Sequence, residues 1–254
     1  QELARGGRAV EEYVARATAH VAHDPARPPR PDVAATLALH RYLWPACLLF
    51  TVPWFLRNRV PRLPVGDVSF HRAGGRMTVR AHAFSCLPDD PAARLPGARI
   101  VSCAAELRNE LRAAIAEHTG PVLEGFRPLL RRGPRALWGM VTDEITEGLW
   151  YVGQLLGRHE EERAVRELAA LLPGGTAPYA GAAGFQPPGD GDNTSVDTPS
   201  GDASDSPAGD VPSASATRSR LTCCLFYTVS PSATCATCPR TCGPERNRRR
   251  AAVA

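Results

Sequence analysis

Apolar residues recur at helical spacing through most of the first 60 residues. Residues 8–22 place apolar side chains three or four positions apart, which predicts an amphipathic helix. A proline-rich break follows it. A second helix is predicted to begin at Asp32, whose side chain can cap it, and to run toward Trp44. Pro45 and Pro53 are expected to kink or end this helix, because proline lacks the backbone N–H that the helical ladder needs.

The period then changes to two. Apolar residues alternate with polar ones at Val68 and Phe70, and again from Met77 onward. Glycines within residues 72–75 can form the turn between these two runs. The pattern predicts a β-hairpin near 67–84, followed by a loop rich in proline and aspartate.

Helical spacing returns over the next seventy or so residues. It predicts four helices, at 107–115, 122–130, 137–156 and 165–172. Short breaks separate them, and glycine and proline follow the first, second and fourth helices. Helices joined by such short breaks usually pack as antiparallel neighbours. The predicted fold class is therefore α+β and predominantly helical, with a helical body at residues 1–173 that carries the small hairpin.

The composition shifts sharply after the last of these helices. Residues 174–219 consist mainly of Gly, Pro, Ser, Ala, Thr and Asp, a composition that buries too little apolar surface to offset the entropy of ordering. We therefore predict a flexible linker there. It leads to a cysteine-rich module at 220–243, which is too small for its own core and must dock on the body or fold around a metal. A basic tail at 244–254 ends the chain.

Charge and hydropathy narrow the range of partners. The net charge is +4, no lysine occurs, and no aromatic residue interleaves with the arginines of the tail, so a nucleic-acid partner is not expected. The longest apolar run, residues 43–56, contains two prolines and is shorter than the roughly 20 residues of a membrane span, which leaves at most peripheral membrane contact. Gln1 opens directly into a helical pattern without an export signal, so a cytoplasmic location with reduced thiols is expected.

Five of the eight cysteines lie between Cys223 and Cys242. Four of them read Cys-Cys, ten residues, Cys-x-x-Cys. A structural zinc ion suits four thiolates, but Cys223 and Cys224 are adjacent, and adjacent side chains diverge by about 100° in a helix and point to opposite faces of a strand. A [2Fe–2S] cluster takes two thiolates on each iron and accommodates two such pairs. Disulfides are the third reading, and they are uncommon in a reducing compartment.

The motif Arg220-x-x-Cys223-Cys224-x10-Cys235-x-x-Cys238 is similar to the C-terminal signature of the ferric-siderophore reductase family typified by FhuF. The layout, a mostly helical body with cysteines near its end, also resembles that family, as does the stretch Leu137-Trp138-Gly139. The resemblance implies a [2Fe–2S] cluster bound by these four cysteines. It implies one-electron reduction of a ferric siderophore, most typically a hydroxamate, with electrons from a donor such as a ferredoxin or a flavoprotein reductase.

Two other functions remain open from the residues alone. One is a zinc-stabilised helical binding module that uses the basic tail and the Trp44–Trp54 region, and the other is an iron–sulfur redox or iron sensor with Cys242 as its reporter. The remaining candidates have plainer interpretations. Cys242 is expected to be a bystander thiol, and Asp143, Glu144 and Glu147 a solvated helix face. The others are expected to be buried thiols (Cys47, Cys86, Cys103), surface residues (His20, His23, Glu106, Glu110) and core aromatics (Trp138, Trp150).

Overall fold

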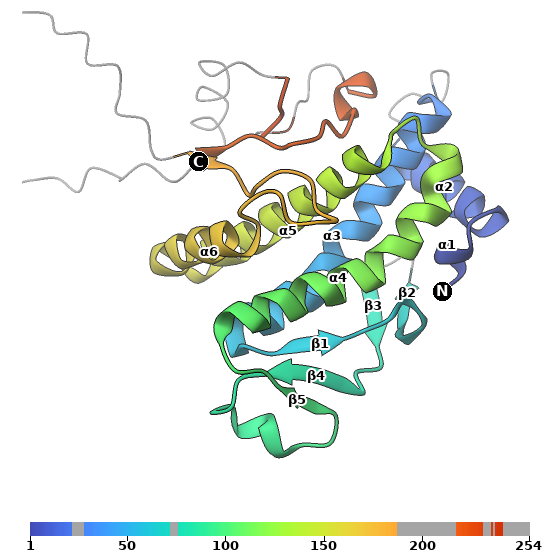
Figure 1. The fold of residues 1–254 in the computed structure, drawn as a ribbon. Coiled ribbons are helices and arrows are strands. Elements are labelled where there is room, and N and C mark those ends of the chain that lie inside the picture. Colours follow the sequence, from blue (N-terminus) through green and yellow to red (C-terminus); the bar gives the residue numbers. More distant parts are fainter. Residues whose placement is uncertain (22–27, 72–75, 187–216, 231–234, 236, 241–254) are drawn as a thin grey trace, which may run out of the picture.

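The longest helix, α3 (Pro31–Arg57), runs through the middle of the molecule (Figure 1). The computed structural model describes residues 1–21, 28–71, 76–186, 217–230, 235 and 237–240. Helices α2 (Arg8–Val21), α4 (Ala104–Phe126) and α5 (Pro134–Leu156) all pack against α3. Its apolar residues point in nearly all directions, which is the pattern of a helix buried in a core.

Three prolines do not end a helix where the sequence indicated that they could. Helix α3 continues through Pro45 and Pro53, and α4 continues through Pro121, so the predicted helices 107–115 and 122–130 are one element. An interior proline costs about 3 kcal/mol. Complete burial of one large apolar side chain contributes about 1.5–3 kcal/mol, and α3 buries several, among them Leu39, Leu43, Phe50 and Phe55, so that together they outweigh the local penalty.

The last two predicted helices are confirmed as α5 and α6 (Arg158–Leu171), which pack against each other. They meet at Gly157, whose φ of 103° is available mainly to glycine. Farther along the pair, a side chain at Gly153 would lie 2.9 Å from the Ala164 methyl group, so the glycine allows close packing. A short helix, α1 (Glu2–Arg5), packs on α4. Short 3-10 turns occur at Val65–Asp67, Pro91–Arg94, Arg127–Leu129 and Phe226–Thr228.

The predicted hairpin is confirmed. Strands β2 (Val68–His71) and β3 (Arg76–Val79) are antiparallel, with Val68 opposite Val79. The alternating pattern does not continue as one strand, because the next strand, β4 (Ala83–Cys86), belongs to a different sheet. That sheet has the order β1-β4-β5, and its outer strands are β1 (Val60–Arg62) and β5 (Ala98–Ile100). Three-residue strands carry too few positions for a recognisable period.

Part of the segment predicted as linker lies against the helical body. Tyr179 is buried and its hydroxyl donates to the carbonyl of Arg112 at 2.6 Å. Farther on, β6 (Phe185–Gln186) pairs antiparallel with β7 (Thr217–Arg218). The ring of Phe185 packs edge-on against Trp150. The body therefore extends to residue 186, and the cysteine segment starts from a strand that is already fixed on it.

Within the described residues, α3 is the one helix long and apolar enough to cross a membrane by length and composition. Its most apolar stretch has a mean hydropathy of 1.3 and is 61% buried inside the protein. The core helices of soluble proteins meet the same criteria, and the burial of α3 is compatible with such a protein.

His118 of α4 makes stability depend on pH. It is fully buried, its Nδ1 donates to the Leu63 carbonyl at 2.8 Å and its Nε2 accepts from the Tyr42 hydroxyl at 2.8 Å. Burial lowers the pKa of His118. The unfolded chain, in which the imidazole titrates near 6.5, therefore binds more protons below about pH 6.5. The free energy of unfolding should fall there by up to about 1.4 kcal/mol per pH unit, measured by urea unfolding.

The substitution His118→Gln should make this pH dependence shallower, and His159→Gln, which removes an imidazole that is 82% exposed, is the matched control. Equal pH slopes in both variants would contradict the assignment to His118.

Candidate iron–sulfur site

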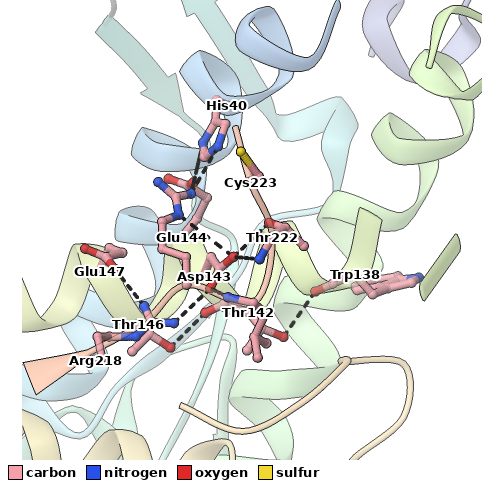
Figure 2. A network of polar contacts seen from close by, with 12 residues as sticks. His40, Trp138, Thr142, Asp143, Glu144, Thr146, Glu147, Arg218, Thr222 and Cys223 are labelled. Atoms are coloured by element: carbon pink, nitrogen blue, oxygen red, sulfur yellow. Dashed lines mark hydrogen bonds and ion pairs between the residues drawn. The ribbon is translucent and has the colours of Figure 1, made fainter. Parts of the chain in front are cut away.

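One carboxylate of α5 holds the chain that leads into the cysteines (Figure 2). Asp143 is fully buried, and its Oδ1 accepts a hydrogen bond from the amide of Leu221 at 2.8 Å. Its Oδ2 accepts from both the amide and the hydroxyl of Thr222, each at 2.8 Å. Because Thr222 directly precedes Cys223, these bonds fix the backbone at the start of the cysteine motif.

Arg218 lies between two acidic residues on one face of α5. Its guanidinium donates to Asp143 at 2.8 Å and to Glu147 at 3.0 Å, and its side chain is fully buried. The two acids are four positions apart and so lie on the same side of the helix. Burial raises the pKa of Glu147, while the charge of Arg218 opposes that rise. Loss of one partner from a buried ion pair costs about 3–5 kcal/mol, because the other charge stays in a poorly solvating interior.

Arg220 connects α5 to α3. Its guanidinium donates to Glu144 at 2.7 Å and to Nε2 of His40 at 3.0 Å. Because a guanidinium has no acceptor, Nε2 is the accepting nitrogen, and Nδ1 of His40 then donates to Glu144. The Arg220 side chain is 11% exposed and Glu144 is 2% exposed, so this charge pair is largely shielded from solvent.

The two halves of the cysteine motif are held together through the backbone. The amide of Arg220 donates to the carbonyl of Thr237 at 3.0 Å, and the amide of Cys238 donates to the carbonyl of Cys235 at 3.0 Å. The Thr237 side chain is also hydrogen-bonded to Glu147. Each half therefore has a threonine, directly before a cysteine, that is bound by a carboxylate of α5.

The four cysteines interact with one another. All four are free thiols in the structure, and the Cys224 and Cys235 side chains are joined by a hydrogen bond. Cys223 lies within electrostatic range of Cys224 and Cys238. Cys238 is 2% exposed, while the other three are partly exposed. The site thus has one buried sulfur and a side that faces the surface.

The hydrogen bond between Cys224 and Cys235 shifts the pKa values of the two thiols in opposite directions. The bond from Cys235, helped by the positive field of Arg220, lowers the pKa of Cys224 to about 5. The same hydrogen bond, together with burial, raises the pKa of Cys235. Thiolate is the form in which cysteine binds a metal, so Cys224 is ready for ligation. Arg132 donates to the carbonyl of Cys223 and adds a further positive charge nearby.

The donor set fits a [2Fe–2S] cluster. Two pairs of free cysteines, supplied by two short segments that are bonded to each other, meet the demand of two irons for two thiolates each. Among the described side chains, these four cysteines included, no group of three or more His, Cys, Asp or Glu residues is arranged around a single metal ion, so the fit rests on the number and chemistry of the donors. The four cysteines are linked in the structure by hydrogen bonding and electrostatic contact, and their backbone is fixed by α5.

One prediction about the site is wrong. Asp143 and Glu144 are buried rather than part of a solvated helix face, and Glu147 has a side chain only 16% exposed. They lie on a helix that is apolar on most other sides, such as at Val141 and Ile145, and this is the signal that could have indicated burial. Arg218, their partner, was not identified from the sequence, because it stands more than 70 residues from them in a polar context.

The other candidates are mostly as expected, but Glu110 is not a surface residue: its side chain is 14% exposed and accepts a hydrogen bond from the Ser85 hydroxyl at 3.0 Å. Trp138 and Trp150 pack on Tyr179 and Phe185 respectively, as core aromatics do. Cys47 and Cys86 are buried, whereas Cys103 is exposed at the start of α4. The predictions for Cys242 and His23, and for the side chain of His20, lie outside the described part of the structure.

The helical body fixes a C-terminal segment with four free cysteines, a donor set of the kind that binds iron–sulfur clusters. The comparison with protein families agrees. Residues 220–240 match the model of the FhuF 2Fe-2S C-terminal domain. The match bears out the resemblance of this segment to the FhuF-like ferric-siderophore reductase family, and it implies a [2Fe–2S] cluster as the cofactor. No curated protein and no solved structure matches the chain.

Gly139 of α5 makes room for the cysteine segment. A Cβ at this position would lie 2.8 Å from Cγ2 of Thr222, which is closer than two carbon atoms can approach. The substitution Gly139→Ala favours α5 itself by about 1 kcal/mol but should displace Thr222 from Asp143. We expect faster hydrogen exchange at the amides of Leu221 and Thr222, read by mass spectrometry or NMR.

Gly120→Ala is the matched control, since it also changes a helical glycine and its Cβ would meet only the Trp138 ring at an ordinary 3.8 Å. Unchanged exchange in the Gly139 variant would show that Thr222 does not depend on this contact.

Proposed function

We propose that the protein is a [2Fe–2S] ferric-siderophore reductase. The observation that carries the proposal is the position of the four cysteines: they interact with one another on a segment that matches an iron–sulfur domain of this family. Cys223, Cys224, Cys235 and Cys238 would be the cluster ligands. When bound, such a cluster supplies single electrons. The protein's own part is to hold these thiolates in place, keep Cys238 from water and leave the opposite side accessible to partners.

The proposed substrate is a ferric siderophore, most typically a hydroxamate. Fe(III) is a hard ion that is bound tightly by hard oxygen ligands, and Fe(II), with its lower charge, is bound far more weakly. One electron added to the complex gives Fe(II) and the free siderophore, and that electron comes from a reduced ferredoxin or flavoprotein. Partial exposure of Cys223 and Cys224 favours electron exchange with the donor and with the ferric siderophore near this surface. We propose the cytoplasm as the location of the protein.

Arginines on the cysteine-bearing side provide charge for anionic ligands. Arg132 bonds to the backbone of Cys223, and Arg240 lies 4.5 Å from the centre of the Tyr227 ring. No acidic residue occurs in residues 217–240, so the segment itself presents only positive charge. This charge favours contact with an anionic ferric complex or an acidic donor.

The cluster is tested by colour and metal content. Protein purified without oxygen should be red-brown and hold two irons per chain, because the site offers two pairs of thiolates. Cys223→Ser should lose the visible absorption, and Cys103→Ser, which alters an exposed thiol of the body, should retain it. A colourless protein with one zinc ion would refute the proposal in favour of the zinc-stabilised module.

The substrate is tested by iron release. Reduced protein mixed with ferrioxamine and an Fe(II) chelator should produce the coloured Fe(II) chelate, because the reduced metal leaves the siderophore. The matched control is the Cys223→Ser variant with the same chemical reductant. If the wild-type protein holds a cluster but releases no more Fe(II) than that control, the reductase assignment is wrong and the sensor function gains support.

A further inference from the structure

We propose that Asp143 is a positioning residue of the iron–sulfur site: its carboxylate fixes the segment Arg218–Thr222 on α5, and thereby places the Cys223–Cys224 pair beside the charge of Arg220. The proposal rests on the cluster part of the proposed function and is independent of the siderophore. Figure 2 shows Asp143 between Arg218 and Thr222, with Cys223 directly beyond.

The hydrogen bonds of Asp143 hold the segment Arg218–Thr222 in position. The carboxylate accepts four, from the guanidinium of Arg218, the amide of Leu221 and both the amide and hydroxyl of Thr222, all at 2.8 Å. A fully buried carboxylate is costly unless its oxygens are bonded and its charge is paired. Asp143 is therefore stabilised only when this segment is docked, and in return it holds the amides of Leu221 and Thr222 directly before the cysteine pair.

Docking also sets the charge beside the cysteines. In the docked segment, the Arg220 side chain lies between Glu144 and His40, and Cys224 lies within range of the positive field of Arg220. In this setting, 11% exposed, a full positive charge interacts more strongly with its neighbours than it would in water. A reduced cluster carries one more negative charge than an oxidised one. The Arg220 charge therefore favours the reduced state, and the Asp143 charge opposes it.

Fixing the backbone and setting the charge beside the cysteines can be tested separately in the full-length protein loaded with its cluster. Hydrogen exchange and iron release test the first. Asp143→Asn can keep the bond from the Leu221 amide but presents an NH2 group to the Thr222 amide, which can only donate. Exchange of the Thr222 amide should accelerate by about tenfold or more, with a smaller change at Leu221. Thr222→Val should release iron to a chelator faster than wild type, and Thr222→Ser, which restores the hydroxyl, should return the rate toward wild type.

The midpoint reduction potential tests whether the charges of Asp143 and Arg220 act on the cluster. A purely structural role would not shift it according to the sign of the charge removed. Glu144 and His40 still hold Arg220 when Asp143 is changed. Asp143→Asn therefore removes a negative charge and should raise the midpoint potential of the cluster, whereas Arg220→Gln removes a positive charge and should lower it. Arg220→Lys keeps the charge and should lie close to wild type. Arg158→Gln, on an exposed ion pair of α6, is the control and should cause no shift.

Each outcome decides the matter. Shifts of opposite sign in the Asp143 and Arg220 variants, with altered Thr222 exchange, support the proposal. Shifts of the same sign, no shifts, or unchanged Thr222 exchange overturn it. Absence of a cluster from the wild-type protein would instead refute the proposed function. The exchange measurement on the metal-free chain would still decide whether Asp143 fixes the segment Arg218–Thr222.

Discussion

The buried carboxylate of Asp143 is the interaction on which the C-terminal part of the structure depends. Folding removes this charge from water, which is unfavourable unless donors replace the lost hydration. Those donors come from Arg218, Leu221 and Thr222, more than 70 residues farther along the chain. Around Asp143, the helical body and the segment that leads into the cysteines therefore stabilise each other: the buried charge needs these donors, and the carboxylate holds their backbone in place.

Helix α5 has two tasks that usually fall to different elements. One side contributes apolar residues such as Ile145 and Leu149 to the core. Another side carries Gly139, Asp143 and Glu147, spaced four residues apart, and binds a threonine from each half of the cysteine motif. This spacing gives both threonines support from one rigid helix, which adds to the backbone bond between Arg220 and Thr237 that joins the two halves directly.

The sequence predicted what local pattern determines. Helix α2, the β2–β3 hairpin and the helices α5 and α6 follow from periodicity, and the cysteine motif follows from spacing. What it missed depends on contacts between distant residues. Proline-containing helices persisted because packing outweighed a local penalty, and three-residue strands carried too little pattern to detect. The acids of α5 were assigned to solvent because their partner, Arg218, lies in a different region of the chain.

The fixed strand at Thr217–Arg218 has a consequence for how the cysteine motif can be moved between proteins. The match to an iron–sulfur domain begins at Arg220, yet the carboxylates that complete it belong to a helix that ends at Leu156. Grafted onto another scaffold, residues 220–240 would bring the sulfurs without their support. A transplantable unit would also need the Gly139–Glu147 face of α5, so the four cysteines and the groups that support them come from separate parts of the sequence.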